Sequence, residues 1–323
     1  MTTITVRGQR FGGVPRDHWR RVNDSLDPDT DFVQIYRNLA VHEFPWDITQ
    51  ALSFALFRTF AVPGIGKLLD ETGAFTGATQ KRYDDTVLLL EVPFLRGFDD
   101  EQGRAAIRRI NQMHRSYDIP NHEMLYVLAT FVVVPQRWIS VWGKRPMTDV
   151  EVRASVRYFR TLGKHMGISD MPDSFEGFAS LMDDYEAEYF AFDSGARRVA
   201  DATLALLASF VSPVPKGVVR VVSLALMDAP LRNALGYSHP PLALERLVTA
   251  AMRARGRALR LFPARLTQRR NADSQRMRSY SDGFVIAQLG TFPGGCPVRS
   301  VDAHATRSGR ATPGPYPAGA SDR

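Results

Sequence analysis

The stretch Asp47–Phe60, with the sequence DITQALSFALFRTF, carries the clearest helical pattern of the chain and ends just before Pro63 and Gly64. The side chains expected to face inward recur at three- and four-residue spacing: Ile48, Leu52, Ala55, Leu56 and Thr59. This is the period of an α-helix that buries one face. Because proline and glycine interrupt helices, the pattern predicts a helix that ends near Phe60.

The same period recurs along the chain, whereas the alternating pattern of β-strands is scarce. Further helices are predicted over Thr79–Leu90, Asp99–Tyr117, Glu123–Val134, Thr148–Gly163, Ser174–Phe190, Arg197–Phe210, Val218–Leu226 and Leu242–Leu261. Thr148 and Glu151 have the spacing of a capping box. Pro93 and Pro135 are expected to close two of the helices. The sequence therefore predicts a single all-α globular domain of about nine or ten helices.

The composition changes after about Pro263, which predicts a division of the chain. A helical domain is expected over residues 15–263, followed by a basic, then Gly/Pro-rich tail over residues 264–323. Residues 290–323 contain 11 glycines and prolines among 34 residues, so this end is expected to be disordered. We expect part of the tail, about residues 278–295, to dock on the domain.

Cysteine content and hydropathy also indicate the cellular compartment in which the protein is expected. The single cysteine, Cys296, forms no internal disulfide, no thiolate metal cage and no c-type haem attachment, each of which needs more than one cysteine. The first residues lack the apolar core of a signal peptide, and no stretch reaches about 18 uncharged apolar residues. These features favour a cytoplasmic protein.

The formal net charge of +7 is unevenly distributed. The region Arg253–Arg278 contains nine arginines and a single acid, Asp273. Such a strip indicates peripheral contact with an anionic surface, either a membrane or a phosphate group. No aromatic residues alternate with the basic ones as in RNA-binding proteins, so no nucleic-acid partner is expected.

Common metal-binding patterns fail on inspection. His122 and Glu123 begin like a zinc-protease helix, but the fifth position is Tyr126 instead of a second histidine. No Glu-x-x-His precedes any of the seven histidines, which argues against a di-iron helical bundle.

His114 is the most informative histidine. It lies four residues after Ile110 and seven after Ile107, so it shares the inward stripe of its helix. Two interpretations fit this position: a core histidine bonded to a backbone carbonyl, and a neutral imidazole that ligates a metal. On the preceding helix, Arg82 and Thr86 share a face, and an inward arginine needs an anionic partner. Asp85, Glu91 or a haem propionate would each serve.

A resemblance bears on these alternatives. Lys81-Arg82-Tyr83-Asp84-Asp85-Thr86 is similar to the Arg-x-x-x-Thr helix of the MpaB and latex-clearing-protein (rubber oxygenase) family, and Met113-His114-Arg115 resembles its Met-His element. Other similar stretches are Ile119-Pro120-Asn121, Met124-Leu125-Tyr126, Pro135-x-Arg137-Trp138, Arg145-Pro146-Met147-Thr148, Leu162-Gly163-x-x-Met166-Gly167-Ile168, Arg197–Thr203, Ala234-Leu235-Gly236-Tyr237, Arg278-Ser279-Tyr280 and Gln288-Leu289-Gly290. The resemblance spans about residues 15–295 and favours the MpaB branch.

The resemblance implies a haem b (iron) pocket in the helical core, with His114 as metal ligand and cofactor-binding residue. Arg82 and Thr86 would be catalytic residues, and Arg82 would also contact the cofactor. The implied function is a haem-dependent oxygenase, an oxidoreductase that cleaves or oxygenates a small apolar, isoprenoid-like molecule with O₂.

Two positions depart from the family pattern. Asp85 stands where rubber oxygenases have a lysine before the threonine, and Leu128 stands where many bacterial relatives have a histidine. The alternative function is a non-catalytic helical protein that binds a lipid or hydrophobic metabolite and associates with an anionic membrane surface through the Arg253–Arg278 region.

Overall fold

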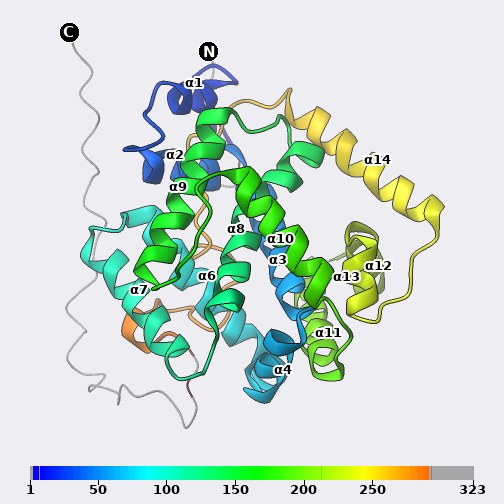
Figure 1. Ribbon diagram of the computed structural model, residues 1–323. Coiled ribbons are helices and arrows are strands. Elements are labelled where there is room, and N and C mark those ends of the chain that lie inside the picture. The colour runs from blue at the N-terminus through cyan, green and yellow to red at the C-terminus, as the bar shows by residue number, and fades with distance from the viewer. Residues whose placement is uncertain (1–2, 7, 212, 291, 293–323) are drawn as a thin grey trace.

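The computed structural model describes residues 3–6, 8–211, 213–290 and 292. Most of these residues are helical, and the helices surround α8 (Figure 1). In chain order the helices are α1 His18–Asp24, α2 Phe32–Asn38, α3 Pro45–Phe60, α4 Pro63–Glu71, α5 Ala74–Gly77, α6 Thr79–Arg96, α7 Glu101–His114, α8 Asn121–Trp142, α9 Asp149–His165, α10 Phe175–Tyr189, α11 Ser194–Ser209, α12 Lys216–Leu226, α13 Ala229–Ala234 and α14 Leu242–Leu259.

Three kinds of shorter element complete the described part of the chain. Strands β1 (Thr3–Val6) and β2 (Gln9–Gly12) form an antiparallel hairpin. A π-helical turn, η1, spans Leu39–Glu43, and a 3-10 turn, η2, spans Ile286–Gln288.

The all-helical prediction is confirmed, but the predicted number of helices is too low. The structure has fourteen α-helices in its described residues. The five that were not predicted, α1, α2, α4, α5 and α13, are four to nine residues long. A segment of that length completes about one to three turns, so it shows no repeated apolar stripe.

Two predicted helix ends are wrong, because α6 continues past Pro93 and α8 continues past Pro135. A proline inside a helix removes one backbone hydrogen bond and bends the axis. Both prolines are buried. Packing of the turns on either side of each proline offsets the lost hydrogen bond, since most helix stability in proteins comes from tertiary contacts.

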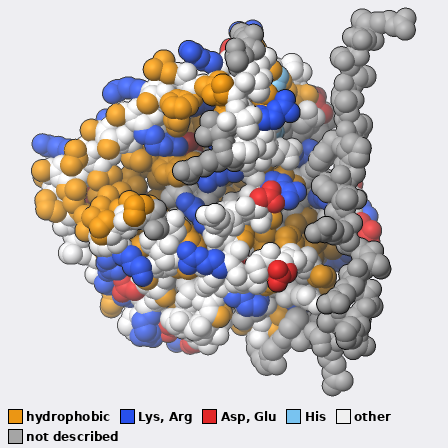
Figure 2. Space-filling model, turned by 180° about the vertical axis from the view of Figure 1, so that it is seen from behind, with side chains coloured by type: hydrophobic (Ala, Val, Ile, Leu, Met, Phe, Trp, Pro, Cys, Tyr) orange, Lys and Arg blue, Asp and Glu red, His pale blue; other side chains and the backbone are white. Residues whose placement is uncertain are grey.

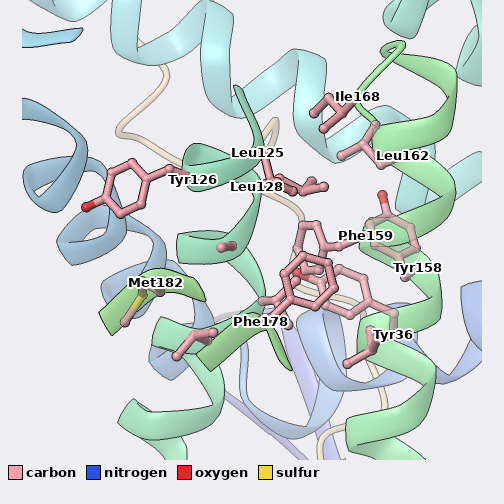
Figure 3. Close-up of a cluster of buried hydrophobic side chains, with 14 of the residues drawn as sticks. Tyr36, Leu125, Tyr126, Leu128, Tyr158, Phe159, Leu162, Ile168, Phe178 and Met182 are labelled. Carbon is pink, nitrogen blue, oxygen red and sulfur yellow. The ribbon is translucent and has the colours of Figure 1, made fainter. Parts of the chain in front are cut away.

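Helix α8 is the central element of the fold. It packs against α3, α9, α10 and α14, and its side chains form a cluster with Tyr36, Tyr158 and Phe159 (Figure 3). Among the described residues, α8 is also the single helix that by itself matches a membrane span in length and hydropathy, with 56% of the tested window buried inside the protein. The bent pair α3 and α4 meets the same test together.

Residues 264–290, here called the C-terminal segment, pack along α6 and α7. Met277 and Leu289 are buried against these helices. The backbone N–H of Ser279 donates to the buried carboxylate of Asp84 at 2.9 Å, and the backbone N–H of Ala272 donates to Glu91 at 3.1 Å. The segment therefore forms part of the wall behind α6. The predicted disorder of the tail falls almost entirely on residues 293–323, which lie outside the described residues.

Candidate active site

His114 lies at the end of α7 and lines an internal cavity. The cavity contains about 1370 Å³ of space not occupied by protein atoms, part of it open to solvent. Ile110 and Met113 of the same helix line it as well, which agrees with the inward stripe. Burial, and then the positive charge of Arg82, lower the pKa of His114 to about 4. The imidazole is therefore neutral at physiological pH, the form in which histidine binds metals.

The ring of His114 has an unsatisfied atom. Its Nδ1 is buried and has no hydrogen-bond partner among the described residues. A core histidine would normally bond a carbonyl through this kind of atom, since buried polar groups are rarely left unpaired. Both interpretations of His114 stay predictions, but within the described part of the chain Nδ1 does not form the carbonyl hydrogen bond that the first one expects.

Arg82 and Thr86 lie one turn apart on α6 and line the same cavity. The guanidinium of Arg82 donates a hydrogen bond to the hydroxyl of Thr86 and lies over the ring of Phe75, 5.2 Å from its centroid. Burial lowers the pKa of Arg82, although the nearby Asp85 counteracts this effect. Among the described residues, no carboxylate forms an ion pair with Arg82.

The carboxylates expected as protein partners of Arg82 are used elsewhere. Asp85 accepts hydrogen bonds from Lys81, at 2.7 Å, and from the hydroxyl of Tyr280. Glu91 accepts from backbone N–H groups of the C-terminal segment. The possibility of an Arg82 ion pair with Asp85 or Glu91 is therefore not realised. A buried guanidinium without an acid is costly unless an anion binds beside it.

The two departures from the family pattern differ in position. Asp85 does not line the cavity, because its carboxylate is directed to Lys81 and Tyr280. Leu128 does line it, together with Leu162 and Ile168, and these three side chains lie together in Figure 3. The place of the absent histidine is thus an apolar part of the cavity wall.

Polar residues of the cavity that the sequence did not predict include Thr72, Tyr117 and Glu123. Tyr117 lies three residues after His114, a spacing that could have placed it on the same face. Glu123 was considered only as part of a zinc motif. It lines the cavity, and burial raises the pKa of its carboxyl group. The Glu123 side chain lies near the first turn of α4. The helical pattern of the sequence did not predict α4, so it gave no sign of this neighbour.

A second cavity lies on the other side of the Arg82–Thr86 pair. It contains about 1110 Å³ of space free of protein atoms, part of it open to solvent. The walls that the two cavities share are formed by Leu56, Phe75, Arg82, Thr86, Leu90 and Phe131. Apart from this pair, the shared wall is apolar, so Arg82 and Thr86 are the polar groups available to both spaces.

The described residues contain no group of three or more His, Cys, Asp or Glu side chains that could hold a metal ion. A metal centre built on His114 would therefore have at most two protein ligands of these kinds among the described residues. That arrangement suits a metal already held by a macrocycle, because the macrocycle supplies the other ligands.

A comparison of the sequence with family models gives one match, over residues 48–260, which contain Arg82, Thr86 and His114. The matching family is described as the catalytic domain of ER-bound oxygenase mpaB/B′ and rubber oxygenase. The chain belongs to this MpaB/rubber oxygenase family. The resemblance found in the sequence is thereby confirmed, and the family is one of oxygenases.

Three fungal relatives support membership in the MpaB/rubber oxygenase family. ER-bound oxygenase mpaB′ of Penicillium brevicompactum is 29% identical over 73% of this chain and 60% of its own length. ER-bound oxygenase mpaB of Penicillium roqueforti is 30% identical over 72% of this chain and 85% of its own length. ER-bound oxygenase mpaB of Penicillium brevicompactum is 30% identical over 65% of this chain and 59% of its own length. The chain thus spans about three fifths of two of these relatives.

Proposed function

We propose that the protein is a haem-b-dependent oxygenase that uses O₂ to cleave or oxygenate an apolar, isoprenoid-like substrate. The proposal rests on two side chains that line one cavity and lack an expected binding partner among the described residues. His114 has a buried nitrogen without a partner, and Arg82 carries a partly buried charge without an ion-paired carboxylate. A haem group fits both, because its iron takes an imidazole ligand and its propionates pair with arginine.

The residues of this chain have distinct roles in the proposal. His114 would hold the iron as a neutral imidazole, and Arg82 would bind an anionic group of the cofactor or orient a polar atom beside it. Thr86 accepts a hydrogen bond from Arg82 and donates one to the backbone oxygen of Arg82 at 2.9 Å. It thereby fixes the guanidinium. Bound haem would supply the iron at which O₂ is activated.

The substrate class follows from the walls of the second cavity. Leu52, Val87, Phe94 and Leu206 contribute apolar surface to it, and such surface binds hydrocarbon chains and excludes water. Addition of both atoms of O₂ across a carbon–carbon double bond gives two carbonyl groups, so this cleavage balances without an external reductant. Arg82 and Thr86 are the polar groups beside which the double bond would lie.

We also propose a functional unit that extends beyond the helical domain of residues 15–263. The C-terminal segment binds α6 through Asp84, Asp85 and Glu91, and α6 carries Arg82 and Thr86. A chain that ends at residue 263 would leave three buried carboxylates without the hydrogen bonds that the C-terminal segment donates. We therefore assign residues 264–290 to the catalytic unit.

An absorption spectrum of the purified protein, with iron and haem quantified, tests this proposal. We expect a Soret band and about one haem per chain, both lost in His114→Ala. The matched control is His122→Ala, because His122 is exposed and does not line the cavity. A protein that stays colourless after incubation with haem would overturn the proposal, as would an unchanged Soret band in His114→Ala. Co-purified lipid without iron would favour the non-catalytic alternative.

A second measurement tests the chemistry. The haem-loaded protein is incubated with a polyisoprenoid and ¹⁸O₂, and the products are analysed by mass spectrometry. We expect carbonyl products, each with one ¹⁸O atom if the double bond is cleaved. Haem binding without any oxygen-dependent product would retain the cofactor assignment and exclude the oxygenase activity on this substrate class.

A further inference from the structure

Exposed apolar side chains are concentrated on one side of the molecule, over α12 and α14. Of the thirteen large apolar residues exposed in the described part of the chain, eight lie between residues 211 and 262. They are Val211, Val214, Val218, Val221, Leu242, Leu247, Leu261 and Phe262. Figure 2 shows a broad apolar area, bordered by Lys and Arg side chains, on the side where these helices lie. Contiguous apolar surface of this kind marks an interaction site.

Helix α14 has three faces. Val248 and Gly256 lie on the buried face, which packs against α8 and α12. The second face is exposed and apolar; at helical spacing it carries Leu247, Ala251, Ala254 and Ala258, and Leu261 continues it in the turn after the helix. The third face is exposed and basic, and it carries Arg246, Arg253, Arg257 and Arg260. An apolar stripe flanked by arginines is the pattern of a helix that lies in a membrane interface.

The arginines of the third face are not neutralised by the protein. Arg246, Arg253 and Arg257 have no ion-paired carboxylate among the described residues, and Arg260 donates to the backbone oxygen of Lys144 at 2.6 Å. The single acid of α14, Glu245, pairs with Arg232 at 2.7 Å. The positive charge of this face is therefore available to an external anion.

The rest of the arginine-rich strip is directed elsewhere. Arg255 pairs with Asp47 at 2.8 Å and lies 3.8 Å from the ring centroid of Trp46. Arg265 donates a hydrogen bond to Gln9, and Arg270 pairs with Asp273 at 2.8 Å. The basic strip that the sequence suggested over Arg253–Arg278 thus divides into structural arginines and a short outward set on α14.

Three of the outward arginines border a surface pocket. Arg253, Arg257 and Arg260 line it together with Arg145. Arg145 is matched by Glu43 and Glu151, so the net positive charge of the pocket comes from α14. The pocket contains about 530 Å³ of space free of protein atoms, part of it open solvent. A phosphate group of a lipid complements this charge.

We propose that α12 and α14 dock the protein on the surface of an anionic lipid bilayer. Leu247, Leu261 and Phe262 enter the boundary between headgroups and acyl chains, while Arg253 and Arg257 bind lipid phosphates. Half-buried Met252 of α14 and Leu52, which lines the second cavity, pack against the same hydrophobic cluster. Docking depends on surface residues alone and is independent of haem binding.

Flotation of the full-length protein with vesicles tests the proposal. The vesicles contain phosphatidylcholine alone, or phosphatidylcholine mixed with phosphatidylglycerol, whose negative surface potential attracts basic residues. We expect binding to the anionic vesicles that weakens as salt is raised. The triple variant Arg253→Gln/Arg257→Gln/Arg260→Gln should lower the partition coefficient by at least about tenfold. The double variant Leu261→Ser/Phe262→Ser should lower it similarly.

The matched control replaces the same number of exposed arginines outside the face: Arg96→Gln/Arg104→Gln/Arg108→Gln. This variant has the same net charge as the α14 triple variant, and we expect its partitioning to stay within about twofold of the wild type. Equal loss in both triple variants would overturn the proposal, because net charge alone would then explain binding. It would equally be overturned if the wild-type protein failed to bind anionic vesicles, or if the apolar face proved to join two copies of the chain in solution.

Discussion

The buried carboxylate of Asp84 holds the backbone N–H of Ser279 at 2.9 Å, which ties the C-terminal segment to the helix that carries Arg82 and Thr86. The same carboxylate accepts from the backbone N–H of Arg278 and from the side chain of Gln80. Asp84 is fully buried and lies in no ion pair among the described residues. Three hydrogen bonds therefore replace the water that this charge would otherwise bind.

Replacement of Asp84 by alanine should destabilise the protein strongly. The change leaves donors from three residues without an acceptor in the interior, and we expect the free energy of unfolding to fall by about 3 kcal/mol. Urea unfolding followed by circular dichroism measures this loss. Asp118→Ala is the control, because Asp118 is exposed, and it should change stability by less than about 0.5 kcal/mol. Equal stability of the two variants would show that the segment does not hold α6.

Replacement of Arg82 by glutamine should stabilise the haem-free protein. Its partly buried charge lacks an ion-paired carboxylate, so removal of the charge should raise the free energy of unfolding by about 1 kcal/mol. The same variant should bind haem more weakly in a titration of the Soret band. Arg58→Gln provides the contrast, because Arg58 pairs with the buried Glu186 and its loss should destabilise by about 3 kcal/mol. A destabilised Arg82→Gln would mean that the protein itself balances this charge.

His42 should make the protein sensitive to acid. Burial is the main cause that lowers its pKa to about 4, and its ring stacks on Trp19 with centroids 3.9 Å apart. Between this pKa and the ordinary value near 6.5, the unfolded chain binds a proton that the folded chain does not, so stability rises with pH. As pH falls from 7 to 4, the wild type should therefore lose up to about 3 kcal/mol that His42→Phe retains. Parallel pH profiles of unfolding free energy for the two proteins would refute this assignment.

Gly256 should be irreplaceable where α14 crosses α8. A Cβ atom at this position would lie 2.6 Å from the backbone oxygen of Trp142 and 2.8 Å from that of Gly143. Backbone atoms cannot move far to make room for a Cβ atom, so Gly256→Ala should lower the free energy of unfolding by about 1–3 kcal/mol. Gly217→Ala is the matched control, since a Cβ there meets nothing within 4 Å. Thermal unfolding of both variants checks the difference, and similar melting temperatures would show that α14 shifts without penalty.

Local signals in the sequence predicted the helices that carry them. The capping box of Thr148 and Glu151 is present at the start of α9, and Ser174 accepts from the backbone N–H of Gly177 at the start of α10. Asn121 precedes the predicted helix Glu123–Val134 and is a typical cap residue, but Pro120 occupies the cap of α8. The side chain of Asn121 instead accepts from the backbone N–H of Ser169. A tertiary contact of this kind leaves no trace in the local pattern.

Local helical spacing also predicted part of the candidate site. Helical spacing placed Arg82 and Thr86 on one face and His114 on an inward stripe, and all three line one cavity. The partners of Asp85 and Glu91 were not predictable, since they come from Tyr280 and Asn271. These contacts join residues 195 and 180 positions apart, and the second uses a backbone N–H group, which every residue except proline possesses.

This separation along the chain sets an order of events during synthesis. Residues of α6 leave the ribosome about 180 positions before the backbone groups that satisfy Glu91. At 5–20 residues per second, this delay is roughly 10–35 s. Until these groups leave the ribosome, three acidic side chains of α6 face water. The C-terminal segment does not yet pack behind the part of α6 that carries Arg82. Loading of the proposed haem into this cavity would thus be a late step, which follows synthesis of the C-terminal segment.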